Sequence, residues 1–123
     1  MPDFNVELMP KAAVGKFILG QLFEDVKKVK KTLFLSVEEI LSTILLLVYD
    51  LKENAVWINI SGDGLLVVNG NKNEIDQQNM PDYLGYHLDI KFDQWLEKHS
   101  KSIEYQDVWD ISIAEAAVLA SIT

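Results

Sequence analysis

Apolar residues recur every three or four positions between Pro10 and Lys31, which is the spacing of one helical face. The pattern predicts an amphipathic helix over this stretch, with its apolar stripe formed by Val14, Phe17, Ile18, Leu22, Val26 and Val29. The sequence SVEE follows, in which Ser36 can cap a second, short helix while Glu39 closes the capping box. We therefore expect two helices near the start of the chain.

Continuous apolar runs replace this spacing between Ser42 and Asp76. The first run, STILLLVYD, predicts a buried strand, with one longer helix as the alternative. Val56–Ile60 and Leu65–Val68 predict two more strands around the sequence SGDG. Asn69-Gly70 predicts a tight turn, because both residues tolerate positive φ, and KNEID adds a short strand after it. The whole stretch is expected to form a meander of three or four antiparallel strands.

The last third of the chain alternates between the two patterns. FDQWLEKH, residues 92–99, places Phe92, Trp95 and Leu96 on one face of a predicted helix. DVWDISIA, residues 107–114, has the alternation of a strand, whereas the final EAAVLASIT is compatible with helix or strand. This order of elements predicts an α+β fold, an antiparallel β-sheet packed against N-terminal helices, in a single domain over residues 1–123.

Composition and charge narrow the range of partners and locations. The 123 residues carry a net charge of −8, which argues against nucleic acid or an anionic membrane as the main partner. The sequence contains no cysteine, so disulfides, thiolate chemistry and cysteine-based zinc sites are excluded. The N-terminal residues lack the pattern of a signal peptide, and the apolar run Ile44–Val48 is too short to cross a bilayer. We expect a cytoplasmic protein.

Asp63 is the candidate metal-binding residue. A turn between two strands can bring its carboxylate close to other acids at the mouth of a sheet, where oxygen ligands hold Mg²⁺ or Mn²⁺. In the alternative interpretation, Gly62 and Gly64 supply unusual backbone angles and Asp63 only caps the turn. His87 and His99 lie too far apart in sequence for ligands on one helix. They form a zinc site only if the fold brings them together, and otherwise are surface or hydrogen-bonded histidines.

Thr43 with ILLLVYD, followed by VWINISGDGLLVVNG, resembles the middle of the metal-dependent type 2C Ser/Thr protein phosphatases. PDYLGYHL stands where that family carries a polar linker, and WDISIA resembles the strand that leads into the family's Ser-Asp-Gly or Thr-Asp-Gly. The resemblance extends over roughly Val14–Ala114. It implies part of a phosphatase-type β-sandwich, in which Asp63 corresponds to an acid near the metal centre.

Three family motifs are missing from this sequence. It lacks the early Asp-Gly-x-Gly-Gly segment and the closing Asp-Asn, and it has Glu115-Ala116-Ala117 where Asp-Gly is expected. Because each missing carboxylate removes charge and geometry, the resemblance implies loss of the dinuclear metal centre. The chain is then a truncated or degenerate relative, a fragment that assembles with another copy or chain, or an unrelated small domain.

We therefore expect a non-catalytic, phosphatase 2C-like regulatory or interaction protein. One alternative is an active Mg²⁺- or Mn²⁺-dependent phosphoprotein phosphatase, which needs Asp63 together with acids such as Asp50, Asp107, Asp110 or Glu115. A second alternative is a small assembly module without a ligand. A partial sandwich leaves a sheet face or edge uncovered, so self-association, as a dimer, or binding to another protein chain is expected.

Overall fold

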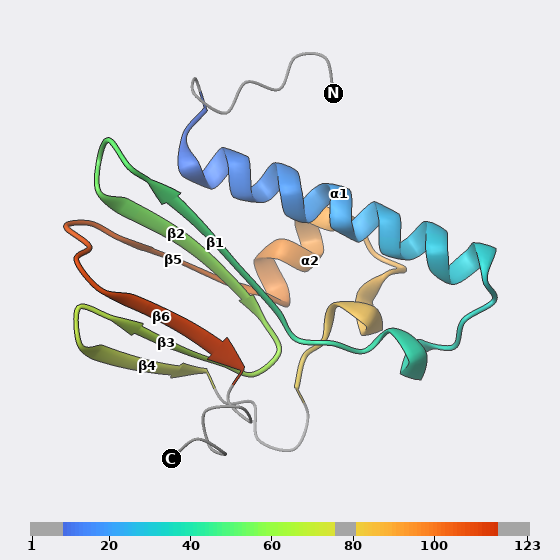
Figure 1. Ribbon diagram of the computed structural model, residues 1–123. Helices are drawn as coiled ribbons and strands as arrows, with labels where there is room; N and C mark the ends of the chain where they lie inside the picture. Colours follow the sequence, from blue (N-terminus) through green and yellow to red (C-terminus); the bar gives the residue numbers. More distant parts are fainter. Residues whose placement is uncertain (1–8, 76–80, 116–123) are drawn as a thin grey trace.

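The computed structural model describes residues 9–75 and 81–115 and has an α+β fold, as predicted (Figure 1). Two α-helices lie on one side of two small β-sheets, which face each other. In chain order the elements are α1 (Lys11–Thr32), the 3₁₀ turn η2 (Val37–Ile40), β1 (Ile44–Asp50), β2 (Ala55–Ser61), β3 (Gly64–Val68), β4 (Asn71–Ile75), the 3₁₀ turn η3 (Leu84–His87), α2 (Phe92–Lys98), β5 (Lys101–Tyr105) and β6 (Ile111–Glu115).

The strands form two three-stranded antiparallel sheets, with the orders β1-β2-β5 and β4-β3-β6. The expectation of one continuous meander is wrong, because β2 and β3 belong to different sheets although only Gly62 and Asp63 separate them. Gly62 has a φ of +99°, and a Cβ atom there would lie 2.6 Å from the Thr43 hydroxyl oxygen. This close bend carries the chain from one sheet to the other.

Two apolar clusters hold the three layers together. Between the sheets, residues of β2 pack against Leu66 and Val68 of β3. Between the first sheet and the helices, Trp57 packs with Leu19 and Phe23 of α1 and with Trp95 of α2. All seven residues of β2 are buried, since the strand has a packed layer on each side. The two apolar segments that flank SGDG are therefore strands of facing sheets.

The helical predictions are confirmed for α1 and α2, and the apolar run of β1 is a strand rather than a longer helix. The predicted second N-terminal helix is only the single turn η2. The Glu39 carboxylate accepts a hydrogen bond from the Ser36 backbone N–H at 3.2 Å, which is one of the two bonds of a capping box, and a second bond from the Ser36 hydroxyl at 3.0 Å. These hydrogen bonds lower the pKa of Glu39.

The turn at Asn69-Gly70 is confirmed, with φ values of 51° and 81°. The Asn69 side-chain oxygen also accepts hydrogen bonds from the backbone N–H groups of Trp109 and Asp110, at 2.8 and 3.1 Å. The residues just before Ile111 therefore form a loop, and β6 begins at Ile111 instead of at Asp107, where the predicted strand began. Strand β5 was not predicted, and residues 116–123 of the ambiguous C-terminal segment lie outside the described residues.

Among residues 9–75 and 81–115, no helix has both the length and the apolar character that crossing a membrane requires. The 22-residue α1 is long enough, but lysines and acids interrupt its apolar positions.

Candidate functional site

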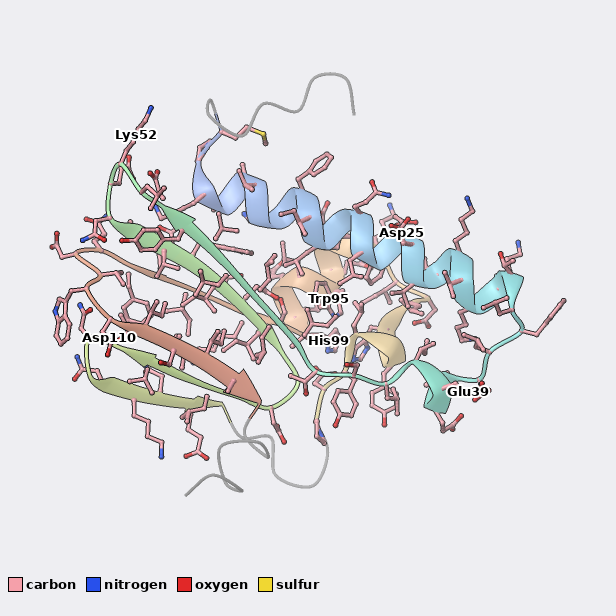
Figure 2. The ribbon with its side chains drawn as sticks, in the orientation of Figure 1. Asp25, Glu39, Lys52, Trp95, His99 and Asp110 are labelled. Carbon is pink, nitrogen blue, oxygen red and sulfur yellow. The ribbon has the colours of Figure 1, made fainter. Side chains whose placement is uncertain are left out.

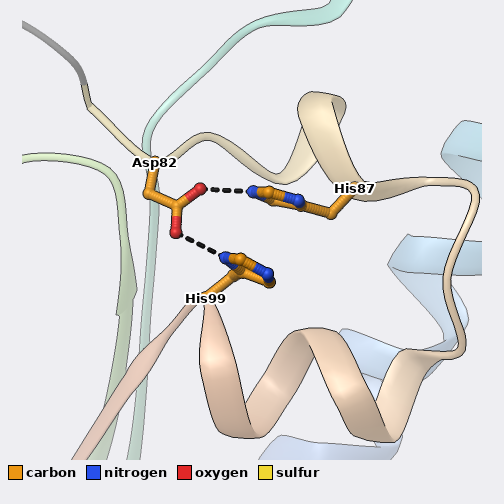
Figure 3. Close-up of side chains that lie close together, drawn as sticks. All are labelled: Asp82, His87 and His99. Carbon is orange, nitrogen blue, oxygen red and sulfur yellow. Dashed lines mark hydrogen bonds and ion pairs between the residues drawn. The ribbon is translucent and has the colours of Figure 1, made fainter.

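Asp82 lies between two histidines that come from different elements (Figure 3). His87 is the last residue of η3, and His99 follows the last turn of α2. His99 Nδ1 is 2.7 Å from one carboxylate oxygen of Asp82, and His87 Nε2 makes a close contact with the other. The two imidazole rings are stacked, with centroids 3.5 Å apart and planes inclined by 13°. We call this group the His–Asp–His cluster.

The three side chains are positioned by well-packed parts of the fold. Asp82 is attached to the end of β2, because its backbone carbonyl accepts a hydrogen bond from the Ser61 hydroxyl at 3.3 Å. His99 is fixed to α2, because its backbone N–H donates to the Trp95 carbonyl at 2.8 Å and Trp95 is fully buried. Turn η3 packs so closely on η2 that a Cβ atom at Gly85 would lie 3.0 Å from the Ile40 carbonyl oxygen.

The cluster is partly open to solvent, and its acid is ionised at neutral pH. The side chains of Asp82, His87 and His99 are 30%, 20% and 28% exposed. Burial on its own would raise the pKa of the Asp82 carboxyl. The hydrogen bonds and charges of the two histidines outweigh burial, so the pKa lies below its ordinary value.

Asp82 should therefore make the stability of the protein sensitive to acid. A carboxyl whose pKa is lowered by folding stabilises the folded state above its unfolded pKa, about 3.9, and this stabilisation is lost as pH falls through the folded pKa. The free energy of unfolding of the wild type should exceed that of Asp82→Asn at about pH 6, and the difference should shrink towards about pH 3. Urea unfolding over this range measures it.

The exposed Asp89, outside the cluster, provides the control variant Asp89→Asn. If the difference between wild type and Asp82→Asn is the same at both ends of the pH range, folding does not lower the pKa of Asp82.

The cluster has the ligand set of a transition-metal site. Among the described residues, Asp82, His87 and His99 are a group whose potential ligand atoms all lie within 4.8 Å of one another. Two imidazole nitrogens with one carboxylate oxygen suit Zn²⁺ and related ions, whereas Mg²⁺ and Ca²⁺ prefer oxygen ligands. His87 Nε2 and His99 Nδ1 both face the Asp82 carboxylate. A bound ion would therefore take the place of their hydrogen bonds to Asp82.

The structure places Asp63, the residue proposed from the sequence, at the half-buried bend between β2 and β3. Ser61, two residues before Asp63, contacts Asp82 of the cluster. Asp63 itself does not belong to the three-ligand group. No observation tests metal binding by Asp63 itself, so this remains a prediction.

Strand register separates Asp63 from three of the acids proposed as its companions. Asp50 pairs with Ala55, at the opposite end of β2 from Ser61. Asp107 and Asp110 contact Asn69, which follows the far end of β3. A five-residue strand is roughly 13 Å long, too far for carboxylates at its two ends to share an ion. Of the proposed companions, only Glu115 pairs at the Asp63 end, with Gly64.

Sequence reasoning recognised that tertiary contact could join His87 and His99, but it missed Asp82. The spacings in this group, five residues and then twelve, match no helical or strand period. Proximity comes from the packing of η3 against α2 and is not encoded in a local pattern.

Comparison with known proteins adds no further assignment: no protein-family model, no curated protein and no solved structure matches this chain. The resemblance to type 2C phosphatases therefore remains a prediction from the sequence.

Proposed function

We propose that this protein binds one transition-metal ion, Zn²⁺ above all, through Asp82, His87 and His99, and acts as a binding protein rather than an enzyme. The observation that carries the proposal is the convergence of two imidazoles on one ionised carboxylate, with potential ligand atoms within 4.8 Å. The ion would link the segment before η3 to the end of α2, and with three protein ligands its fourth tetrahedral position would be left to water.

The surroundings of the cluster favour binding over catalysis. A cavity of about 570 Å³ lies between η3 and α1 and is lined by Gly85, Tyr86 and Leu88 together with lysines of α1. A second cavity, of about 340 Å³, lies beside the start of α1 and the end of β1. None of the three proposed ligands lines either cavity. A substrate held in one of these two cavities would contact none of the three proposed ligands.

A non-catalytic, phosphatase 2C-like regulatory or interaction role in the cytoplasm remains our broader proposal. It is supported by the packing of helices on one side of two facing sheets. It is also supported by the separation of Asp63 from Asp50, Asp107 and Asp110, because an active dinuclear hydrolase needs several acids around one centre.

Calorimetric titration with ZnCl₂ near pH 7.5 tests metal binding. We expect one Zn²⁺ per chain. Mg²⁺ at millimolar concentration should not compete. Lowering the pH should weaken binding, since protons then occupy the ligand nitrogens.

Two conservative variants separate metal binding from folding. His87→Gln and His99→Asn can retain an amide hydrogen bond to Asp82 but are poor zinc ligands. Each should weaken Zn²⁺ binding on the order of 100-fold, whereas Asp89→Asn should not change it. Unchanged affinity in both histidine variants, or no binding by the folded wild type, would refute the site.

A further inference from the structure

The cavity between η3 and α1 brings together three lysines of one helix. It has a volume of about 570 Å³, and Lys27, Lys30 and Lys31 of α1 line it. Small-molecule binding sites have volumes of roughly 300–1,000 Å³, so this cavity is large enough for an organic ligand. Asp89 is the acid among the described residues that line it, so three positive charges and one negative charge give the lining a net charge of +2. The whole chain, in contrast, has a net charge of −8.

The helix itself does not account for this grouping of lysines. Residues three and four positions apart lie on one side of a helix, so Lys27 shares a side with Lys30 and Lys31, and their like charges repel. The helix dipole favours cations in the last turn, where Lys30 and Lys31 lie, but it acts little on Lys27, which belongs to the turn before. An anion bound between the three lysines would replace this repulsion with attraction.

The acids of the protein leave most of this positive charge unneutralised. In residues 9–75 and 81–115, neither Lys30 nor Lys31 forms an ion pair. Lys27 pairs with Glu24 at 3.8 Å, but the Glu24 side chain is 63% exposed, and ion pairs in contact with water are weak. Asp25, which Figure 2 labels on α1, lies nearly opposite the three lysines on a helix with 3.6 residues per turn.

Lys27 is held beside the cavity before any ligand binds. Its Nζ atom donates a hydrogen bond to the Ile90 carbonyl at 3.4 Å and lies 4.6 Å from the centre of the Phe23 ring. Ile90 directly follows Asp89 of the cavity lining, so this hydrogen bond fixes the ammonium group close to the site. A lysine that is already positioned loses less side-chain freedom on binding an anion than a fully solvated one.

The rest of the cavity offers apolar and aromatic contacts. Val37 and Leu88 are half-buried, and Tyr86 is 51% exposed. An exposed tyrosine ring can stack on a flat ring of a ligand. The Asp89 carboxylate can accept a hydrogen bond from a ligand hydroxyl or amino group. A bare inorganic anion would contact the lysines and leave these other surfaces unused.

We propose that this cavity binds a small phosphate monoester that carries a flat ring, such as a mononucleotide. The phosphate group would contact the three lysines, and the ring would lie against Tyr86 and Leu88. A phosphate monoester suits three lysines better than a carboxylate does, because it carries nearly two negative charges and three strong acceptor oxygens. The proposal does not rest on the metal site, since none of the three proposed metal ligands lines this cavity.

Titration of the ¹⁵N-labelled protein with AMP, followed by NMR, tests the site. The protein is first treated with a chelator and dialysed, because a bound Zn²⁺ ion would itself attract phosphate. We expect saturable shifts of the backbone signals of residues 27–37 and 85–90. AMP should bind at least about tenfold more tightly than inorganic phosphate, which lacks the ring, or adenosine, which lacks the charge.

Lysine variants locate the phosphate group. Lys30→Gln should weaken AMP binding on the order of tenfold, because it removes a charge-assisted hydrogen bond. Lys28→Gln is the matched control: it makes the same change in the same helix, but Lys28 is exposed and lies about 100° around the helix from Lys27. Tyr86→Ala should weaken AMP binding about fivefold and leave the binding of inorganic phosphate unchanged. Circular dichroism checks that every variant is folded.

Four results would overturn the proposal. These are no saturable binding at about 10 mM AMP, equal losses in Lys28→Gln and Lys30→Gln, inorganic phosphate binding as tightly as AMP, which would mean an adventitious ion only, and binding to vesicles of phosphatidic acid and phosphatidylcholine without binding of AMP, which would mean a lipid headgroup. The His99→Asn variant should bind AMP like the wild type, so failure of the metal site leaves this proposal testable.

Discussion

Replacing Gly15 with alanine should destabilise the protein by about 2–3 kcal/mol. A Cβ atom at this position would lie 2.1 Å from Cζ3 and 2.3 Å from Cε3 of Trp57, far inside the sum of the van der Waals radii. Trp57 is 2% exposed and belongs to the central strand β2, so its ring has no free space to occupy. Alanine improves the helix propensity of α1 by up to about 1 kcal/mol, and overpacking should exceed this gain.

Gly20→Ala is the matched control because it makes the same change in the same helix. Its Cβ atom would lie 3.3 Å from the edge of the Phe92 ring, which needs only a small shift. We expect the free energy of unfolding to change by less than about 1 kcal/mol. Urea unfolding followed by circular dichroism measures both variants without relying on tryptophan fluorescence.

A double variant identifies the cause of the Gly15 effect. Trp57→Leu removes the ring atoms that the alanine would strike, so Gly15→Ala should cost at least about 1 kcal/mol less in the Trp57→Leu background than in the wild type. Additive effects of the two substitutions would contradict a direct clash between α1 and Trp57.

Replacing Trp95 with alanine should have a still larger effect, a loss of about 3–5 kcal/mol. Trp95 is fully buried, and its ring centroid lies 5.9 Å from that of Phe23 and 5.8 Å from that of Phe92. The truncation leaves a cavity between α1 and α2. It also loosens the helix end that positions His99, so Zn²⁺ affinity should fall together with stability, as calorimetry would detect.

Trp95→Phe separates the packing of the ring from its polar nitrogen. The Nε1 atom of Trp95 is buried and has no hydrogen-bond partner among the described residues. Phenylalanine therefore keeps most of the packing and loses no hydrogen bond, and we expect a cost below about 1.5 kcal/mol. Trp109→Ala, at a side chain that is 75% exposed, should change stability by no more than about 0.5 kcal/mol. Equal losses in the Phe and Ala variants would point to a role for the indole nitrogen.

Much of the fold could be predicted because its periodic patterns are strong. The stripe from Val14 to Val29 identified α1, and the apolar runs identified β1, β2 and β3. Strand β5 was missed because KSIEY is mostly polar and three of its five residues face solvent. The change of sheet at Gly62 could not be predicted either, since a hairpin and a crossing between sheets need the same turn residues.

The candidate site was harder to predict than the fold. Asp63 attracted attention because two glycines mark it in the sequence. Asp82 has no such mark, and only the packing of η3 and α2 brings it between His87 and His99. A site assembled from three separate segments depends on tertiary distances, which composition and periodicity do not contain.

Strand β2 has neighbouring strands along both edges and a packed layer against each face. Every amide group in the middle of this strand is therefore shielded from water, and hydrogen exchange there requires the whole domain to open. Its deuterium uptake would report global unfolding directly, even in variants whose helices or loops have become loose.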